Sequence, residues 1–209
     1  MALIAEPGMG KTTLLYRLLE GLRDSARSVF LFQTQCDSRE FFRYILSELG
    51  IKTARMGLVS MHKRLNEVLF SEMLAGRRFV LVVDEAQDLE DPVLETIRLL
   101  SDFETPHAKL LGIILSGQPL LAEKLAQPAL SQLKQRIAIV RRLEPLSADE
   151  TCCYIEHRLK VAGYSGSRLF EPGALALIGE QTRECRFHRA AIAHRGEPCS
   201  RDSCLGTHP

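Results

Sequence analysis

The first thirteen residues, MALIAEPGMGKTT, constrain the fold of this chain more than any other stretch. A short apolar run over residues 2–5 leads into a loop with two glycines and then into Lys11, Thr12 and Thr13. Glycines in such a loop let backbone N–H groups turn inward around phosphate oxygens, where a Cβ would obstruct them. A helix that begins after the loop adds its positive end. The stretch therefore predicts a strand, a phosphate-binding loop and a helix, which is the start of an α/β fold.

Each part of this loop has an expected task. Lys11 is expected to bring a positive charge to the β- and γ-phosphates of a nucleotide, and Thr12 to offer its hydroxyl to Mg²⁺. The pattern ordinarily begins with glycine, where this chain has Ala5. A chance match in a loop is the alternative, but the leucines that follow at helical spacing favour nucleotide binding. The predicted nucleotide-binding residues are Glu6, Pro7, Gly8, Met9, Gly10, Lys11, Thr12 and Thr13.

Composition places the chain among ordinary globular proteins. Its 209 residues are 45% hydrophobic and 25% charged, with a formal net charge of +1. A charge so close to zero predicts neither a nucleic-acid partner nor a membrane partner. No apolar run approaches the ~20 residues that a membrane span needs. Because the chain opens on the predicted strand and not on a signal peptide, the expected location is cytoplasmic.

A second motif ends the most apolar strand of the chain. Residues 78–85, RFVLVVDE, contain five consecutive apolar residues, as expected for a strand buried on both faces of a parallel sheet. Asp84 is placed to hold Mg²⁺ through water, and Glu85 to orient and polarise an attacking water. A solvated acidic turn is the alternative. The glycine-rich loop favours the catalytic interpretation, because the two motifs supply complementary halves of one Mg–nucleotide site.

Two further strands are expected before the chain becomes helical. The strand over residues 110–116 ends in the sequence SGQP, where a polar side chain could contact the γ-phosphate or its water. Gln118 is preferred over Ser116 for this task, and a plain turn is the alternative. The last strand is expected over residues 137–140. A capping box at Ser147 and Glu150 then predicts a helix that ends near residue 163.

The chain is expected to divide into three parts. Residues 1–145 form the α/β core, and residues 146–181 form a partial helical lid. Residues 182–209 carry arginine, histidine and cysteine with almost no periodic apolar residues, which predicts a basic tail without folded structure. The cysteines and histidines of this tail do not have the spacing of a standard zinc site.

Together the motifs resemble those of AAA+ ATPases. More narrowly, the chain resembles the ExeA-type group (general secretion pathway protein A), which is related to the TniB- and MuB-type transposition ATPases. The resemblance implies a P-loop parallel five-stranded sheet flanked by helices and followed by a partial α-helical lid, with ATP and Mg²⁺ as cofactors. The matching segments are AEPGMGKTTLLYRLLE, VLVVDEAQDLE, IRLLSDFET, LLGIILSGQPLL, LKQRIAIVRRLEPLSADE and YIEHRLKVAG.

The resemblance also implies roles for individual residues. Arg136 stands where such ATPases carry an arginine finger, which reaches the γ-phosphate bound in a neighbouring subunit. A finger of this kind implies a homo-oligomer, whereas the alternative for Arg136 is a solvated charge. The predicted catalytic residues are Glu85, Gln118 and Arg136, and the predicted metal-binding residues are Thr12 and Asp84.

Three functions remain open from the sequence. The preferred one is Mg-dependent ATP hydrolysis that drives assembly or remodelling of an unknown protein partner, as in secretion. The second is an ATP-dependent DNA-binding adaptor of the transposition type that hydrolyses slowly. The third is an inactive fragment, because the chain begins inside the first strand and its segment from residue 182 lacks the arginine motif of the family's lid. These two departures predict a truncated or frameshifted family member.

Overall fold

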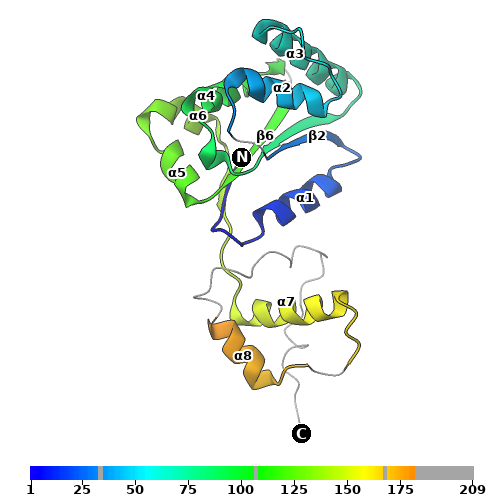
Figure 1. Cartoon of the computed structure of the whole chain (residues 1–209), viewed down its shortest axis with the longest axis vertical. Coiled ribbons are helices and arrows are strands. Elements are labelled where there is room, and N and C mark those ends of the chain that lie inside the picture. Colours follow the sequence, from blue (N-terminus) through cyan, green and yellow to red (C-terminus); the bar gives the residue numbers. More distant parts are fainter. Residues whose placement is uncertain (33–34, 106–107, 167–168, 182–209) are drawn as a thin grey trace. The chain divides into compact units, whose positions relative to one another are not determined.

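The computed structural model describes residues 1–32, 35–105, 108–166 and 169–181 (Figure 1). The chain forms two compact units. The first comprises Met1–Ala5 and Leu18–Arg142, and the second comprises Glu6–Arg17 together with the chain from Leu143 onward. The tail predicted over residues 182–209 lies outside the described residues.

A five-stranded parallel sheet forms the centre of the first unit (Figure 1). Every pairing between neighbouring strands of this sheet is parallel, so all carboxyl ends meet at one edge. This arrangement confirms the predicted fold class. The strands, in spatial order, are β2 (Ala26–Leu31), β3 (Arg78–Val83), β6 (Leu111–Gly117), β1 (Ala2–Ile4) and β7 (Val140–Arg142).

Helices lie between the consecutive strands of this sheet along the chain, because parallel strands cannot be joined by a tight turn. Helix α1 (Lys11–Gly21) begins in the second unit and ends in the first. A short antiparallel pair, β4 (Glu104–Thr105) and β5 (Ala108–Lys109), precedes β6. The other helices of the first unit are α2 (Ser38–Glu48), α3 (Leu58–Leu74), α4 (Asp91–Leu100), α5 (Pro119–Leu125) and α6 (Ser131–Arg136), with single 3₁₀ turns η1 (Ala86–Asp88) and η2 (Pro128–Leu130).

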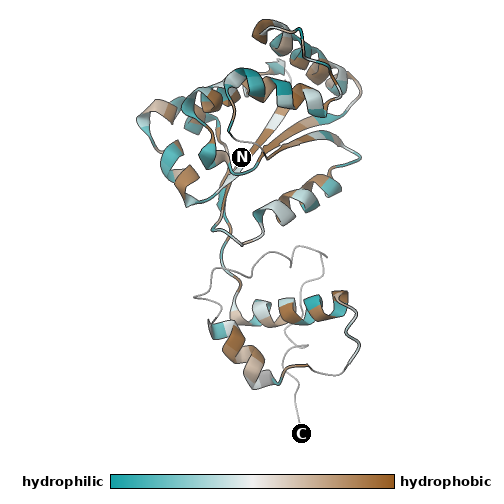
Figure 2. Cartoon of the chain, in the orientation of Figure 1, coloured by the Kyte–Doolittle hydropathy of each residue, from teal (hydrophilic) through white to brown (hydrophobic). Residues whose placement is uncertain are grey.

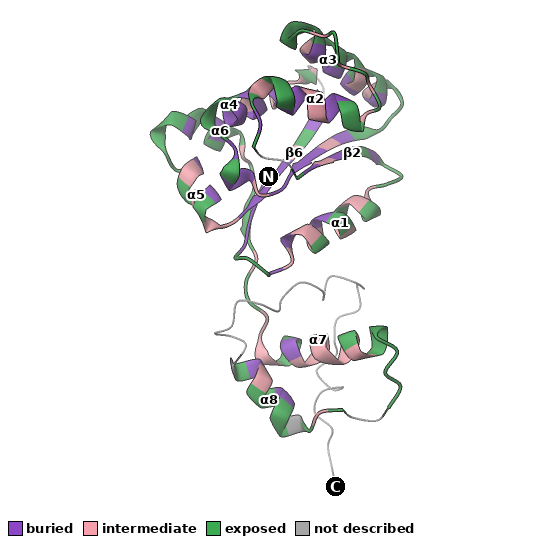
Figure 3. Cartoon of the chain, in the orientation of Figure 1, coloured by how far each residue is buried: buried purple, intermediate pink, exposed green. Residues whose placement is uncertain are grey.

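The main core lies on one face of the sheet, beneath α2, α3 and α4 (Figure 1). Alternate residues of β3, namely Phe79, Leu81 and Val83, pack into it. The residue between the last two, Val82, is also fully buried, so β3 is covered on both faces as its unbroken apolar run predicts. Figure 2 shows the apolar character of the central strands, and Figure 3 shows that the same strands are buried. Each such side chain contributes about 1.5–3 kcal/mol, as an upper estimate.

A buried carboxylate links α3 to the sheet. Glu72 accepts hydrogen bonds from Arg77 Nε at 2.7 Å and from Arg27 Nη1 at 2.9 Å. The hydrogen bond from Arg77 is the main cause that lowers the pKa of Glu72, and burial acts in the opposite direction. This carboxylate therefore stays charged although it is buried, and it fixes the end of α3 against the first residues of β2 and β3.

The second unit contains α7 (Ala148–Val161) and α8 (Pro172–Gln181). Ser147 Oγ accepts from the Glu150 backbone N–H at 3.2 Å, and Glu150 Oε2 accepts from the Ser147 N–H at 2.7 Å, which confirms the predicted capping box. The two helices contact each other, and Cys152 Sγ donates to the Leu175 carbonyl oxygen at 3.6 Å. Among the described residues, no helix combines the length and the apolar character needed to cross a bilayer.

The predicted position of the last strand is wrong by about three residues. The sequence placed it over residues 137–140, whereas β7 covers Val140–Arg142. Ile137 ends helix α6 instead, and its side chain packs against the core. Pairing with β1 begins only where Ala2 donates its N–H to the Ile139 carbonyl oxygen at 2.8 Å. The apolar residue at the start of the run 137–140 therefore reflects packing of Ile137 against the core and does not mark the beginning of a strand.

Candidate active site

The loop between β1 and α1 has the backbone geometry of an anion cradle. Gly8 and Gly10 have φ angles of 77° and 79°, in the left-handed region that favours glycine. The N–H of Met9 donates to the Glu6 carbonyl oxygen at 3.3 Å, which closes a tight turn. Helix α1 begins immediately after Gly10, whose carbonyl oxygen accepts from the Leu14 N–H at 2.9 Å. The positive end of the dipole of α1 thus lies at the loop, and a helix N-terminus of this kind suits an anion.

Side chains of the loop divide into an inner and an outer set. Met9 and Lys11 are buried, and Lys11 is only 5% exposed, which is unusual for a lysine. Thr12 is half-buried in the first turn of α1. Glu6, Pro7, Gly8 and Thr13 are exposed. The loop is thus anchored by Met9 while its glycine backbone stays accessible.

Two carboxylates directly follow β3 at the carboxyl edge of the sheet. Asp84 is 3% exposed, and its N–H donates to the Leu31 carbonyl oxygen at 2.9 Å, which continues the pairing of β2 with β3. Glu85 donates its N–H to Asp84 Oδ1 at 3.0 Å. With φ 50° and ψ 40°, Glu85 is the one non-glycine residue of positive φ among those the structure describes. Such a conformation costs on the order of 1–3 kcal/mol and persists where surrounding contacts impose it.

The side chain of Glu85 is held by two amide groups. Its Oε2 accepts from Gln87 Nε2 at 2.7 Å and from Gln118 Nε2 at 3.2 Å. Gln118 follows β6, so the structure brings together two of the predicted catalytic residues from neighbouring strand ends. Gln87 was not predicted to belong to the site. The only signal in the sequence was a polar residue two positions after an acidic pair, which does not show that its side chain turns inward.

Ser116 provides an independent observation at the same edge. It is wholly buried, and its Oγ has no hydrogen-bond partner. Val83 pairs with Leu115 in the β3–β6 register, so the next residues, Asp84 and Ser116, follow opposite each other and point to the same face. A buried hydroxyl without a protein partner is satisfied by water or a ligand. Because Mg²⁺ usually keeps several waters, the pair of Asp84 and Ser116 fits a hydrated metal ion.

The described residues contain no group of three or more histidine, cysteine, aspartate or glutamate side chains that could hold a metal ion together.

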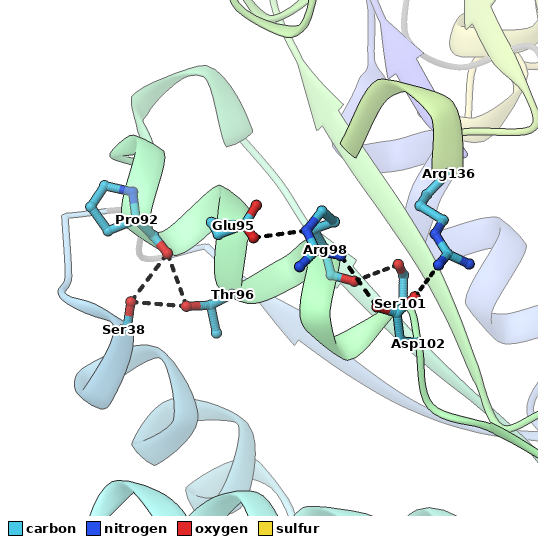
Figure 4. A network of polar contacts seen from close by, with 8 residues as sticks. All are labelled: Ser38, Pro92, Glu95, Thr96, Arg98, Ser101, Asp102 and Arg136. Carbon is cyan, nitrogen blue, oxygen red and sulfur yellow. Dashed lines mark hydrogen bonds and ion pairs between the residues drawn. The ribbon is translucent and has the colours of Figure 1, made fainter. Parts of the chain in front are cut away.

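Arg136 does not join the Glu85 cluster. Its Nη2 lies 2.6 Å from Asp102 Oδ1 in an ion pair that lacks the alignment of a hydrogen bond (Figure 4). Arg136 also lines a hollow of about 340 Å³ together with Met1 and Leu111, which lie where β1 and β6 begin. The seven residues of β6 span roughly 20 Å. Arg136 ends α6 just before the amino end of β7, whereas Glu85 follows the carboxyl end of β3.

The partner of Arg136 is fixed by the end of α4 (Figure 4). Arg98 Nη1 donates to Asp102 Oδ2 at 3.3 Å, and Arg98 Nε donates to Glu95 Oε1 at 2.8 Å. The hydrogen bond with Glu95 is the main cause that raises the pKa of Arg98. At the other end of α4, Thr96 Oγ1 contacts the Pro92 carbonyl oxygen and Ser38 Oγ, both at 2.9 Å. These contacts give Asp102 a defined position just after α4, a helix that is also tied to α2 through Ser38.

A family model described as an AAA domain matches residues 1–125. The chain belongs to the AAA domain family. Over 177 residues this AAA domain is 37% identical to General secretion pathway protein A of Aeromonas hydrophila, a match that covers 84% of the chain and 32% of that protein. The predicted resemblance to an AAA+ P-loop ATPase of the general secretion pathway protein A type is thereby confirmed.

Solved structures share the fold of this AAA domain. Cdc6p from Pyrobaculum aerophilum matches 86% of the chain with a TM-score of 0.64 and 22% identity. The ORC2 protein of Aeropyrum pernix matches 86% of the chain with a TM-score of 0.62 and 17% identity. The chain spans 47% and 49% of these two structures, and about a third of the curated relative. At such identities the two structures support the P-loop architecture and nothing finer.

Proposed function

We propose that this AAA domain binds Mg-ATP and hydrolyses it, and that hydrolysis drives the assembly or remodelling of a protein partner in secretion. The observation that carries the proposal is the cluster around Glu85, in which an acidic residue of strained backbone is oriented by two amides at the carboxyl edge of a parallel sheet. Ligands of open α/β sheets bind at this edge. Strand β1 ends at the same edge and continues directly into the glycine loop.

In the proposed reaction, the loop and the strand ends have separate tasks. The backbone N–H groups around Gly8 and Gly10 hold the phosphate oxygens, and Lys11 contributes its charge to the β- and γ-phosphates. Thr12 and Asp84 hold Mg²⁺, directly and through water. Held by these residues, Mg²⁺ would supply positive charge against the negative charge that develops during transfer.

Glu85 orients the attacking water by accepting one of its protons in a hydrogen bond. The water oxygen bonds to the γ-phosphorus while the bond from that phosphorus to its bridging oxygen breaks, which leaves ADP and phosphate. Gln118 is the residue that detects the γ-phosphate, because its side chain already contacts Glu85. The loss of phosphate would then alter the position of the general base.

The proposed active form is a homo-oligomer in the cytoplasm, a ring or a filament. Support comes from the place of Arg136, which ends α6 ahead of β7 and, in the structure, pairs with Asp102 and not with the Glu85 cluster. A finger supplied by a neighbouring subunit completes the charge stabilisation of the transferred phosphoryl group. The secretion role is supported by the relative from Aeromonas hydrophila and by the chain's nearly neutral charge.

The test is ATP binding and turnover, measured on the parent chain and on two variants. Glu85→Gln should keep ATP binding and lower turnover about 10²- to 10⁴-fold, the range for loss of a general base. Lys11→Ala should remove ATP binding. Glu90→Gln, an exposed carboxylate five residues after Glu85, is the matched control and should behave like the parent. A Glu85→Gln variant that hydrolyses ATP at the parent rate would refute the assignment of Glu85.

The partner class is tested with the same assay. Turnover that rises with protein concentration and does not change when duplex DNA is added supports the secretion-type function. DNA binding that weakens steeply as salt is raised, with DNA-stimulated turnover, would replace this function with the DNA-binding adaptor. A folded chain that binds no ATP would contradict both.

A further inference from the structure

Gln87 uses both ends of its side-chain amide at the proposed site. Its Nε2 donates to Glu85 Oε2 at 2.7 Å and to Asp88 Oδ2 at 3.3 Å. Its Oε1 accepts from the Gln118 backbone N–H at 3.1 Å. At 7% exposure, Gln87 is a buried polar residue whose hydrogen-bonding groups are occupied. One side chain therefore connects the end of β3 to the end of β6.

The surroundings of Gln87 leave its side chain little freedom. Ala86 and Leu89, which flank the turn, are fully buried. Lys124 of α5 donates to the carbonyl oxygen of Gln87 at 3.3 Å and to that of Leu89, which holds the turn from the other side. On β6, a Cβ added at Gly117 would lie only 2.6 Å from Gln87 Oε1. The missing side chain at position 117 is thus what makes room for the amide.

We propose that Gln87 is a positioning residue for hydrolysis, which sets the orientation of the Glu85 carboxylate toward the attacking water. This inference rests on the proposed function, because it concerns the residue assigned there as the general base. The last torsion of a glutamate side chain is broad, so an isolated carboxylate adopts many orientations. Two donors that converge on Oε2 select one of them, and the shorter of the two contacts comes from Gln87.

The same bridge also transmits movement. Gln118 contacts Glu85 through its side chain and Gln87 through its backbone. A displacement of Gln118 on binding or loss of the γ-phosphate therefore changes both donors of Glu85 together. Gln87 converts a change at the tip of β6 into a change at the carboxylate. A merely structural residue, which only ties two strand ends together, would affect stability and not the chemical step.

Two variants of Gln87 distinguish a residue that positions Glu85 for hydrolysis from one that only ties two strand ends together. Gln87→Met keeps the size of the side chain and removes its hydrogen bonds to Glu85, Asp88 and the Gln118 N–H. Gln87→Glu keeps an oxygen for the Gln118 N–H and removes the donor to Glu85. Gln132→Met, the same change at an exposed position of α6, is the control. The measurements are kcat, the Kd for ATP, the free energy of unfolding, and the exchange rate of the Gln118 amide by NMR.

The proposal predicts that both Gln87 variants lower kcat by roughly 10- to 100-fold, the effect of losing a hydrogen bond to a charged group. The Kd for ATP should stay within about twofold, since hydrogen bonds to Glu85 do not hold the nucleotide. The Gln118 amide should exchange faster in Gln87→Met and stay protected in Gln87→Glu. Normal turnover in Gln87→Glu, or a loss of ATP binding that parallels the loss of turnover, would overturn the proposal.

The same experiments distinguish failure of the Gln87 proposal from failure of the proposed ATPase function. If the parent chain binds ATP without turnover, hydrolysis by this chain is refuted, and the Gln118 amide still decides whether Gln87 bridges the two strand ends. If the parent turns over and the Gln118 amide exchanges alike in all variants, the bridge itself is refuted and the ATPase assignment stands.

Discussion

The position of Arg136 leads to a mixing experiment between two inactive variants. Arg136→Ala removes the proposed finger and keeps Glu85, whereas Glu85→Gln removes the general base and keeps the finger. Each variant alone should be nearly inactive, with Arg136→Ala reduced on the order of 10³-fold if the finger acts as fingers do in other phosphoryl-transfer enzymes. A mixture should recover turnover, because a site built by an Arg136→Ala subunit receives Arg136 from a Glu85→Gln neighbour.

The size of the recovery follows from the geometry. Arg136 comes before the amino end of β7 and Glu85 after the carboxyl end of β3, and the proposed finger acts on the site of a neighbouring subunit. In an equimolar, randomly assembled ring with one kind of head-to-tail interface, half of the subunits carry an intact Glu85 and half of their neighbours carry an intact Arg136. Turnover should therefore reach about a quarter of the parent value, a large increase over either variant.

Phosphate release is measured at a fixed total protein concentration while the ratio of the two variants is changed. A finger that acts between subunits gives a maximum at equal amounts and parent-like dependence on total concentration. A straight line between the two inactive end points would refute this arrangement, and so would parent-like turnover by Arg136→Ala alone. Arg23→Ala, an exposed arginine after α1, is the matched control and should hydrolyse ATP like the parent.

Three further predictions concern the framework of the site. The lowered pKa of Glu72 means that its stabilising contribution is present above the ordinary glutamate pKa and is lost as pH falls through the lowered value, so Glu72→Gln should flatten the acid side of the stability–pH curve in chemical denaturation. Gly117→Ala places a Cβ 2.6 Å from Gln87 Oε1 and 2.8 Å from Leu121 Cδ2; it should destabilise the fold by about 1–3 kcal/mol and lower kcat as the Gln87 variants do. Asp102→Asn should leave the monomer's stability within about 1 kcal/mol, because the pair with Arg136 is exposed, and should lower the protein concentration at half-maximal turnover.

Most of the sheet could be predicted from the sequence because its strands are marked by burial. The unbroken apolar run of β3 and the largely apolar β6 are typical of the centre of a parallel sheet, and the structure puts them there. Strand β7 was misplaced because it carries Val140, Arg141 and Arg142, all exposed. An edge strand of three exposed residues has backbone pairing without an apolar pattern, so periodicity does not reveal it.

The candidate site was only partly accessible to sequence reasoning. Glycines, lysine and the acidic pair are recognisable because each chemistry demands its residue type at a set spacing. The bridge made by Gln87 was not, since it depends on the left-handed backbone of Glu85 and on the missing Cβ at Gly117. Neither of these two features can be recognised before the structure shows the ends of β3 and β6 next to each other. Likewise, the sequence marked Arg136 as a finger without showing that Asp102 holds it.

The weakness of that ion pair is what makes an exchange of partners feasible. The side chains of Arg136 and Asp102 are 41% and 37% exposed, and pairs of this kind contribute about 0–1 kcal/mol. An arginine that binds a phosphate in a site shielded from water gains more, because hydrogen bonds between charged groups are about twice as strong as neutral ones. Assembly would therefore draw Arg136 away from Asp102 at little expense. A fully buried, bidentate pair would instead hold the finger in its own chain and oppose assembly, so the partial exposure of both side chains is itself an argument that Arg136 changes partners.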